Sequence, residues 1–139
     1  MPEHLADARI QQFLATKEVV VLATLQASGA PLAMPMWFLH TPDALYMISV
    51  AETQKVRNLR RDPRVCVVAE TGNRGAEIRG VTVQGRIEFV DELQPRRPIV
   101  EQLLRKYDPH LVRLWGGPAM PTNRVLFRIV PEKVRSWGL

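Results

Sequence analysis

Positive charge is concentrated between residues 53 and 65, which read TQKVRNLRRDPRV. Ten consecutive positions hold one acid, Asp62, and five cations, which are Lys55, Arg57, Arg60, Arg61 and Arg64. The planar guanidinium group of Arg matches the geometry of phosphate and carboxylate groups. The stretch therefore indicates an anionic ligand or partner, although a solvated basic helix face would have the same composition.

Hydroxyl groups and cations meet where a strand is expected to pass into a helix. Ser49 closes an apolar run, and Thr53, Lys55 and Arg57 fall at the start of the helix that should follow. Backbone N–H groups at a helix N-terminus have no intrahelical partner, and the helix dipole favours an anion there. The spacing thus predicts a phosphate-binding junction.

Other kinds of chemical site find no support in the sequence. His4, His40 and His110 are scattered, and Cys66 is the only cysteine, so no metal-ligand spacing occurs. The sequence also lacks a Gly-x-Ser-x-Gly motif and the Gly-rich phosphate loops. We therefore expect no metal site, no serine hydrolase and no P-loop or dinucleotide-binding fold.

The size and composition of the chain fit one globular domain over residues 1–139. The 139 residues are 46% hydrophobic and 24% charged, with a net charge of +5 and a pI of about 10.0. No apolar run follows a basic start, and no stretch reaches the ~18 apolar residues of a membrane span. These features predict a cytoplasmic protein.

The junction should lie within a chain that is mainly β. Strands are predicted over residues 19–25, 32–39, 44–50, 65–70, 76–90, 125–130 and 134–138. Helices are predicted within 3–16, between Thr53 and Asp62, and over 98–107, with a loop at 108–122 that could hold one helical turn. Short turns between most strands favour an antiparallel barrel over alternating βαβ units.

Three residues should shape the strands. Pro35 lacks a backbone donor, so its strand belongs at a sheet edge or a bulge. Gly80 and Gly85 should bend the long strand at 76–90, because a bulge costs little at glycine.

Three segments resemble the pyridoxamine-phosphate-oxidase-like split-barrel flavoproteins: VVVLATLQASGAPLAMPMWF, ALYMISVAETQKVRNLRRDPRVCVV and VTVQGRIEFVDE. The resemblance implies an antiparallel split β-barrel with a few short helices. It also implies a homodimer with the cofactor between the subunits. The stretch KVRNLRRDPRV is similar to the branch that binds FMN or the deazaflavin coenzyme F-420.

The resemblance also implies positions for the cofactor. It places the phosphate at the junction, with the residues Ser49, Thr53, Lys55, Arg57 and Asn58. It lays the ring against the strand that holds Met34, Pro35, Met36 and Trp37. Arg79 falls near a polar position that faces the cofactor in relatives, and Trp115 or Trp137 could cover the ring.

This chain departs from the pyridoxamine phosphate oxidases at the substrate. Met34 and Leu39 stand where those oxidases carry Arg and Lys, and only SWGL remains of their C-terminal substrate segment. We therefore do not expect that oxidase activity. The missing strand cation and the surplus of Arg at the helix favour the longer anionic tail of coenzyme F-420 over FMN.

The resemblance thus predicts hydride transfer between a flavin-type cofactor and a small conjugated substrate. Tyr46, Tyr107 or a water could supply a proton, and the sequence does not choose among them. One alternative is a carrier that binds the cofactor without turnover. Another is a nucleic-acid binder, which is disfavoured because aromatic residues do not alternate with the cations.

Overall fold

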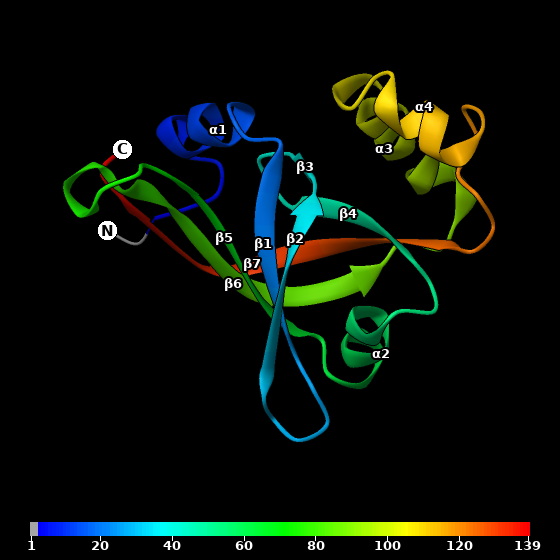
Figure 1. Cartoon of the computed structure of the whole chain (residues 1–139), viewed down its shortest axis with the longest axis horizontal. Coiled ribbons are helices and arrows are strands. Elements are labelled where there is room, and N and C mark those ends of the chain that lie inside the picture. The colour runs from blue at the N-terminus through cyan, green and yellow to red at the C-terminus, as the bar shows by residue number, and fades with distance from the viewer. Residues whose placement is uncertain (1–2) are drawn as a thin grey trace.

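The computed structural model describes residues 3–139 as one strongly curled antiparallel sheet with short helices around it (Figure 1). The strand order across the sheet is β2-β1-β5-β6-β7-β4-β3. The strands are β1 (Val19–Leu25), β2 (Pro31–Trp37), β3 (Leu39–His40), β4 (Leu45–Val50), β5 (Arg64–Thr71), β6 (Arg79–Phe89) and β7 (Arg124–Trp137). The mainly β, split-barrel prediction is therefore confirmed.

Four α-helices lie around the sheet. They are α1 (Ala8–Ala15), α2 (Gln54–Arg61), α3 (Leu93–Lys106) and α4 (His110–Trp115), and a 3-10 turn spans Gly75–Glu77. In Figure 1, α3 and α4 lie together above the right-hand end of the sheet, and α2 lies below it, where β4 ends. No helix within residues 3–139 is both long enough and apolar enough to cross a membrane.

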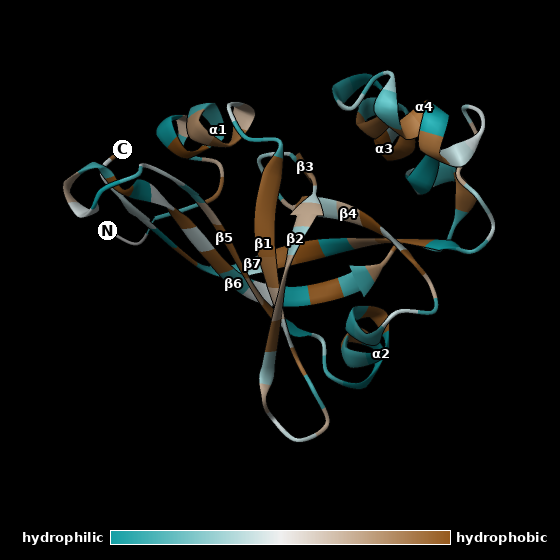
Figure 2. Cartoon of the chain, in the orientation of Figure 1, coloured by the Kyte–Doolittle hydropathy of each residue, from teal (hydrophilic) through white to brown (hydrophobic). Residues whose placement is uncertain are grey.

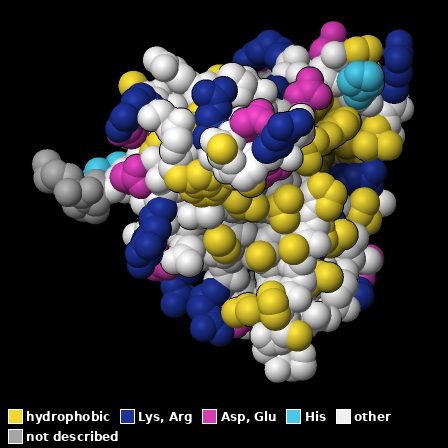
Figure 3. All heavy atoms as spheres, turned by 60° about the vertical axis from the view of Figure 1, so that its left-hand side comes forward, with side chains coloured by type: hydrophobic (Ala, Val, Ile, Leu, Met, Phe, Trp, Pro, Cys, Tyr) yellow, Lys and Arg dark blue, Asp and Glu magenta, His cyan; other side chains and the backbone are white. Residues whose placement is uncertain are grey.

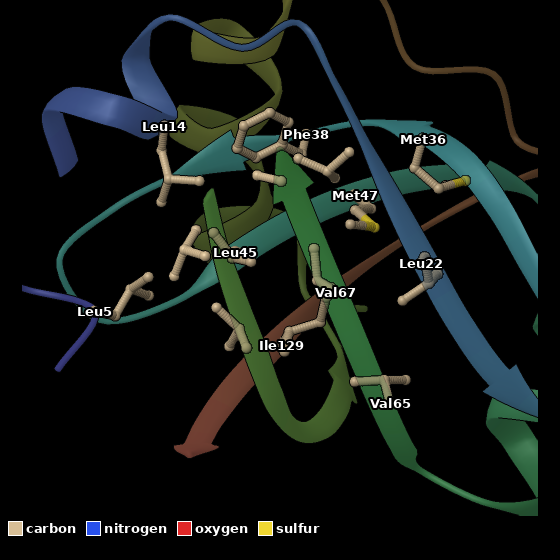
Figure 4. Packing of buried hydrophobic residues seen from close by; sticks show 14 of the residues in the cluster. Leu5, Leu14, Leu22, Met36, Phe38, Leu45, Met47, Val65, Val67 and Ile129 are labelled. Atoms are coloured by element: carbon tan, nitrogen blue, oxygen red, sulfur yellow. The ribbon is translucent and has the colours of Figure 1, made fainter. Parts of the chain in front are cut away.

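The core fills the inside of the curled sheet, because apolar side chains alternate along the strands and point to one side. Figure 2 shows this alternation as hydrophobic bands along the central strands. Figure 4 shows Leu22, Met47, Val67 and Ile129 converging from four different strands. A second cluster packs α3 and α4 against the sheet, with Leu39, Val100, Leu103, Tyr107, Leu111 and Leu126 buried in it.

The strands predicted at 19–25 and 32–39 pair as the β1–β2 hairpin, whose register runs from Val19 opposite Trp37 to Leu25 opposite Pro31. Pro35 lies on β2, which is the edge strand, as its missing N–H group requires. The predicted bulge at Gly85 is also confirmed, because the β6–β7 register shifts between Gln84 and Gly85. At Gly80 the register with β5 and β7 continues without a shift, so the bulge expected there is wrong. A Cβ at Gly85 would lie 2.1 Å from the Val130 carbonyl oxygen, so only glycine fits.

Several predicted element boundaries are wrong. The strand expected at 76–90 begins only at Arg79, and the strand expected at 32–39 is divided into β2 and β3. The strands expected at 125–130 and 134–138 form one strand, β7, because the bulge at Gly85 places Pro131 in register and the ladder continues past it. The helix expected at 98–107 begins at Leu93. Proline usually occupies a first helical turn, but here Pro98 lies inside α3.

One face of the sheet carries apolar side chains that point outward. The β1–β2 register puts eight of them on the same side: Val19, Val21, Ala23, Leu25, Pro31, Ala33, Pro35 and Trp37. We call this set the outer hydrophobic face. Figure 3 shows hydrophobic side chains gathered over a broad area that reaches the protruding hairpin at the bottom of the view.

Candidate functional site

A cavity of about 400 Å³ lies where the ends of β2 and β4 meet the start of α2 and the α3–α4 pair. Its volume is within the range of small-molecule sites. Its lining residues are Pro35, Met36, Trp37, Ile48, Ser49, Val50, Lys55, Leu103, Tyr107, Leu111, Leu114, Trp115 and Arg124. We call it the β2–β4 cavity.

The first turn of α2 brings Lys55 to one end of this cavity. Thr53 is the N-cap, as predicted, and its hydroxyl accepts a hydrogen bond from Val56 N at 3.4 Å. The same hydroxyl donates to the Val50 carbonyl at 3.1 Å, which ties the helix to the end of β4. Val56 is buried beneath the helix, which anchors the backbone of the neighbouring Lys55 at the helix start.

A second cation reaches the same end from a distant part of the chain. Strand β7 pairs with β4 so that Arg124 lies opposite Val50. Arg124 Nη1 donates to the Asn123 side-chain oxygen at 2.7 Å, which holds the guanidinium near the start of β7. The β4–β7 pairing therefore places Arg124 and Lys55 in one cavity although 69 positions separate them.

The charge at this end is not neutralised within the chain. Among residues 3–139, neither Lys55 nor Arg124 forms an ion pair with a carboxylate, and no acidic side chain lines the cavity. Burial lowers the pKa of Lys55 from its ordinary value. Two partly buried cations in a largely apolar cavity favour an anionic ligand, which would offset their desolvation.

Ser49 contributes differently from the cations. It is buried at the end of β4, and its hydroxyl donates to the Val50 carbonyl at 3.2 Å. In this arrangement the Ser49 hydroxyl can accept a hydrogen bond from a ligand in the cavity but cannot donate one. To donate to an anion, the hydroxyl has to rotate away from that carbonyl.

The other end of the cavity is aromatic and aliphatic. The rings of Trp37 and Tyr107 stack in parallel, with centroids 4.4 Å apart and an angle of 4° between the planes. Leu111, Leu114 and Trp115 from α4 form the wall on this side. The cavity thus has a cationic end and an apolar end, which suits a ligand with an anionic group on a flat hydrophobic body.

The structure brings together half of the site residues expected from the sequence. Pro35, Met36, Trp37, Ser49 and Lys55 line the cavity, and so does Trp115. Thr53 lies directly beside it as the cap of α2.

The remaining expected residues lie elsewhere. Met34 is half-buried on β2 opposite Leu22, outside the cavity lining. Arg57 is exposed on the outer side of α2, where its Nη2 donates to Gln54 Oε1 at 3.2 Å. Arg79 starts β6 at the opposite end of the sheet, near Gly138.

Asn58 is fully buried and holds α2 to the sheet. Its Nδ2 donates to Thr24 Oγ1 at 3.0 Å, and its Oδ1 accepts from Gln54 Nε2 at 2.8 Å. Both ends of its amide are therefore engaged within the protein.

Sequence reasoning missed Arg124 as a cavity residue and named Tyr107 only as one of several possible proton donors, not as part of the cavity wall. Arg124 directly precedes the strand predicted at 125–130, but its place beside α2 depends on the pairing of β7 with β4. Tyr107 ends a predicted helix, and its contact with Trp37 depends on how that helix packs. A correct prediction of the strand order would have placed Arg124 in the cavity. No local feature of the sequence predicts the contact of Tyr107 with Trp37.

Comparison with known proteins places this geometry in a family. The sequence model of the family described as Pyridoxamine 5'-phosphate oxidase matches residues 6–138. None of the curated proteins matches this chain in sequence.

Solved structures support the same grouping. The conserved hypothetical protein Rv2991 from Mycobacterium tuberculosis is 29% identical, with a TM-score of 0.80 over 94% of this chain and 83% of its own. A candidate pyridoxamine 5'-phosphate oxidase from Listeria innocua is 27% identical, with a TM-score of 0.75 over 96% and 98%. An FAD-binding protein from Mesorhizobium loti is 25% identical, with a TM-score of 0.74 over 94% and 92%.

Proposed function

This chain belongs to the pyridoxamine 5'-phosphate oxidase family, and from that premise we propose that its β2–β4 cavity binds a flavin-type coenzyme. With it, the protein transfers hydride to or from a small conjugated organic substrate. The observation that carries the proposal is the pair Lys55 and Arg124, two cations without a carboxylate partner among residues 3–139, in an otherwise largely apolar cavity.

The phosphate of the coenzyme lies at the cationic end in this proposal. Lys55 and Arg124 contribute charge, and the N-terminus of α2 contributes free N–H groups and the positive end of its dipole. Ser49 turns its hydroxyl toward the phosphate when the ligand binds. The flat ring then lies along Pro35, Met36 and Trp37 at the end of β2.

The choice between FMN and coenzyme F-420 depends on the outer side of α2. Arg57, Arg60 and Arg61 are exposed there, and among residues 3–139 none of them forms an ion pair with a carboxylate. Their charge favours the longer anionic tail of coenzyme F-420. Arg57→Ala should then weaken coenzyme F-420 binding and leave FMN binding unchanged, which separates the two cofactors.

The chemistry of the reaction comes from the coenzyme, which carries the hydride when bound. The residues of the chain bind the charged end, orient the ring against β2 and exclude water through Leu111, Leu114 and Trp115. Oxidation of pyridoxamine phosphate is not part of the proposal. Met34 and the buried Leu39 stand where those oxidases carry cations.

A second copy of the chain covers the outer hydrophobic face in this proposal. Pro35 and Trp37 belong both to that face and to the wall of the β2–β4 cavity. A partner that packs on the face therefore lies beside the ligand. A closed twofold dimer buries the same surface on both copies and so accounts for the exposed apolar side chains.

The absorbance spectrum of the purified protein, with mass spectrometry of any released cofactor, tests the proposal. We expect a flavin or deazaflavin spectrum, or its appearance on titration with FMN or coenzyme F-420. Stopped-flow oxidation of the reduced coenzyme by quinones and enones then separates an enzyme from the alternative of a carrier. A protein that binds neither coenzyme contradicts the proposal.

A further inference from the structure

The hydroxyl of Tyr107 holds three backbone groups together. Tyr107 follows α3 and lines the β2–β4 cavity, and only 4% of it is exposed. Its oxygen accepts a hydrogen bond from Phe38 N at 2.8 Å, and its single proton faces two carbonyl oxygens, Glu18 at 2.7 Å and Phe38 at 3.0 Å. The hydroxyl therefore joins the end of α3 to the residues that precede β1 and β3.

This arrangement makes Tyr107 a poor proton donor to a ligand. To reach a ligand, the proton would have to leave both carbonyl oxygens, and a buried network of hydrogen bonds would be broken. Burial also raises the pKa of Tyr107 to about 12, because a phenolate at this place would be desolvated. The ring of Tyr107 thus belongs to the cavity wall, whereas its hydroxyl belongs to the fold.

Tyr46, the second tyrosine of the chain, is engaged elsewhere. It lies on the same face of β4 as Ile48, which lines the cavity, but two residues away and outside the lining. There it packs against the cluster that joins α3 and α4 to the sheet, and it lies opposite Arg128 of β7. Hydrogen bonding by Glu88, and to a lesser degree by Tyr46, raises the pKa of Arg128.

The other polar side chains of the cavity lie at its cationic end. Ser49 donates its proton to the Val50 carbonyl at 3.2 Å. Lys55 and Arg124 hold the phosphate in the proposed function, so their protons are used there. At the apolar end, where the reacting ring lies in that function, Tyr107 is the only ionisable side chain of the lining within residues 3–139.

We propose that water, and not a side chain, supplies the proton that completes the reduction, in a step that follows hydride transfer. This inference rests on the proposed function. Hydride passes from the anionic form of the reduced coenzyme to the β-carbon of a conjugated ketone, and the C=C π pair moves so that the carbonyl oxygen becomes negative. The enolate then takes a proton from water at its α-carbon and leaves hydroxide.

The α4 wall determines when this proton arrives. Leu111, Leu114 and Trp115 line the apolar end, so water reaches the enolate as the enolate leaves the cavity. A substrate can wait for its proton only if conjugation carries the negative charge to an oxygen. A localised carbanion would need an acid in place. The substrates are therefore acceptors such as enones and quinones, whose reduced anions carry their charge on oxygen.

The configuration of the product at its α-carbon tests the inference directly. An acid fixed in the cavity protonates one face and yields one enantiomer, whereas water outside the cavity protonates both faces. We expect the reduced coenzyme and an α-methyl cyclic enone without a β-substituent to give a racemic product, measured by chiral chromatography early in the reaction. A single enantiomer would overturn the inference.

Variants of the two tyrosines test it through the rate. A general acid contributes ~100-fold or more, so Tyr107→Phe should lose no more than about threefold in kcat. Tyr46→Phe is the matched control outside the cavity lining and should stay within about twofold of wild type. A loss of ~100-fold in Tyr107→Phe with unchanged coenzyme affinity would identify Tyr107 as the acid. If this variant does not fold, the configuration of the product decides.

The Tyr107 hydroxyl is also testable in the protein without a ligand. A hydroxyl proton that faces buried carbonyls exchanges slowly with water, so NMR of the protein with isotope-labelled tyrosine should detect it. The signal should be lost in Tyr107→Phe and kept in Tyr46→Phe. Rapid exchange of the Tyr107 proton would mean that its hydroxyl is open to the cavity, against the inference.

The outcomes separate this inference from the proposed function. If the protein binds neither FMN nor coenzyme F-420, the proposed function is wrong and the inference is wrong with it. If the coenzyme binds but reduces no conjugated acceptor, the protein is a carrier and the inference is wrong, while the proposed binding stands. If an enone is reduced to a single enantiomer, only the inference is wrong.

Discussion

At the scale of single residues, Lys106 and Tyr107 are neighbours whose protons respond to burial in opposite ways. Burial lowers the pKa of Lys106 to about 8 and outweighs the attraction of Glu18, which raises it. Burial raises the pKa of Tyr107 to about 12. Because both side chains bond to the backbone of Phe38, beside Trp37, changes in their protonation at alkaline pH should change the stability of the folded protein.

The free energy of unfolding should therefore rise with pH between about 8 and 10 and fall above 10. The folded protein releases the Lys106 proton near pH 8, while the unfolded chain keeps it to about 10.5, so the unfolded state binds more protons in this window. Tyr107 reverses the slope, because the unfolded chain loses its proton near 10 and the folded protein keeps it to about 12. Urea denaturation across pH 7.5–11 measures both the rise and the fall in the free energy of unfolding.

Two variants test which residue causes the rise and which causes the fall in the free energy of unfolding. Lys106→Met should reduce the rise, to which the lowered pKa of Lys55 also contributes, and Tyr107→Phe should reduce the fall. A wild-type stability that decreases steadily from pH 8 would contradict this account of Lys106.

At the same scale, the sequence was sufficient for the cavity residues that lie next to one another in the chain. Ser49 and Lys55 follow from a junction that can be seen in the sequence, whereas the end of β2 was expected only from the resemblance to the family. Arg124 and Tyr107 depend on the pairing of β7 with β4 and on the packing of α3, which are long-range contacts. Arg57 has the expected charge at the expected place, but the helix turns its side chain away from the cavity.

At the scale of elements, α2 is the part of the site that needs the firmest support, because it positions Lys55. Its underside is held by Val56 and Leu59, which are buried, and by the hydrogen bond from Asn58 to Thr24. Val56 and Leu59 are the apolar residues of an otherwise polar helix, so their burial follows from the sequence. The amide–hydroxyl pair could not be predicted, since Thr24 lies on β1, 34 positions earlier.

Asn58→Ala should lower the free energy of unfolding by ~1–3 kcal/mol, the cost of leaving a buried hydrogen-bonding group without its partner. Chemical denaturation measures the change. Arg57→Ala is the neighbouring control on the exposed side of α2 and should stay within ~0.5 kcal/mol of wild type. Equal stabilities of the two variants would mean that Asn58 does not anchor the helix.

The positions of the strands were easier to predict than where one strand ends and the next begins. A β-branched run located β1, alternating apolar residues located β6, and Gly85 located the bulge. Whether two apolar runs form one strand or two depends on the partner strand, and β6 carries the ladder of β7 past Pro131. The start of α3 was missed because its first residues, from Leu93, are mostly exposed and show no apolar period.

At the scale of the whole molecule, the outer hydrophobic face is the feature that a single copy does not account for. Apolar side chains continue from β1 onto β5, where Val68 pairs with Val21 and Cys66 pairs with Ala23. Soluble monomers rarely leave a continuous apolar surface of this kind uncovered. The proposed second copy removes it from water and closes the cavity beside Trp37.

Val21→Glu should shift the protein from dimer to monomer in analytical ultracentrifugation, because a charge would be buried without a partner in the proposed interface. Leu93→Glu is the control, since Leu93 is equally apolar and 62% exposed but lies at the start of α3, away from the face. An unchanged sedimentation coefficient for Val21→Glu, or a wild-type protein that is monomeric at high micromolar concentration, would contradict the proposed dimer.

The most direct test of the anion-binding end of the β2–β4 cavity is the affinity of the double variant Lys55→Ala/Arg124→Ala for FMN relative to riboflavin, by titration calorimetry. The account predicts that FMN binding weakens by at least ~1–3 kcal/mol, the scale of a lost charge-assisted bond, while riboflavin binding stays as in wild type. An FMN affinity equal to that of the wild-type protein would show that the phosphate is held elsewhere.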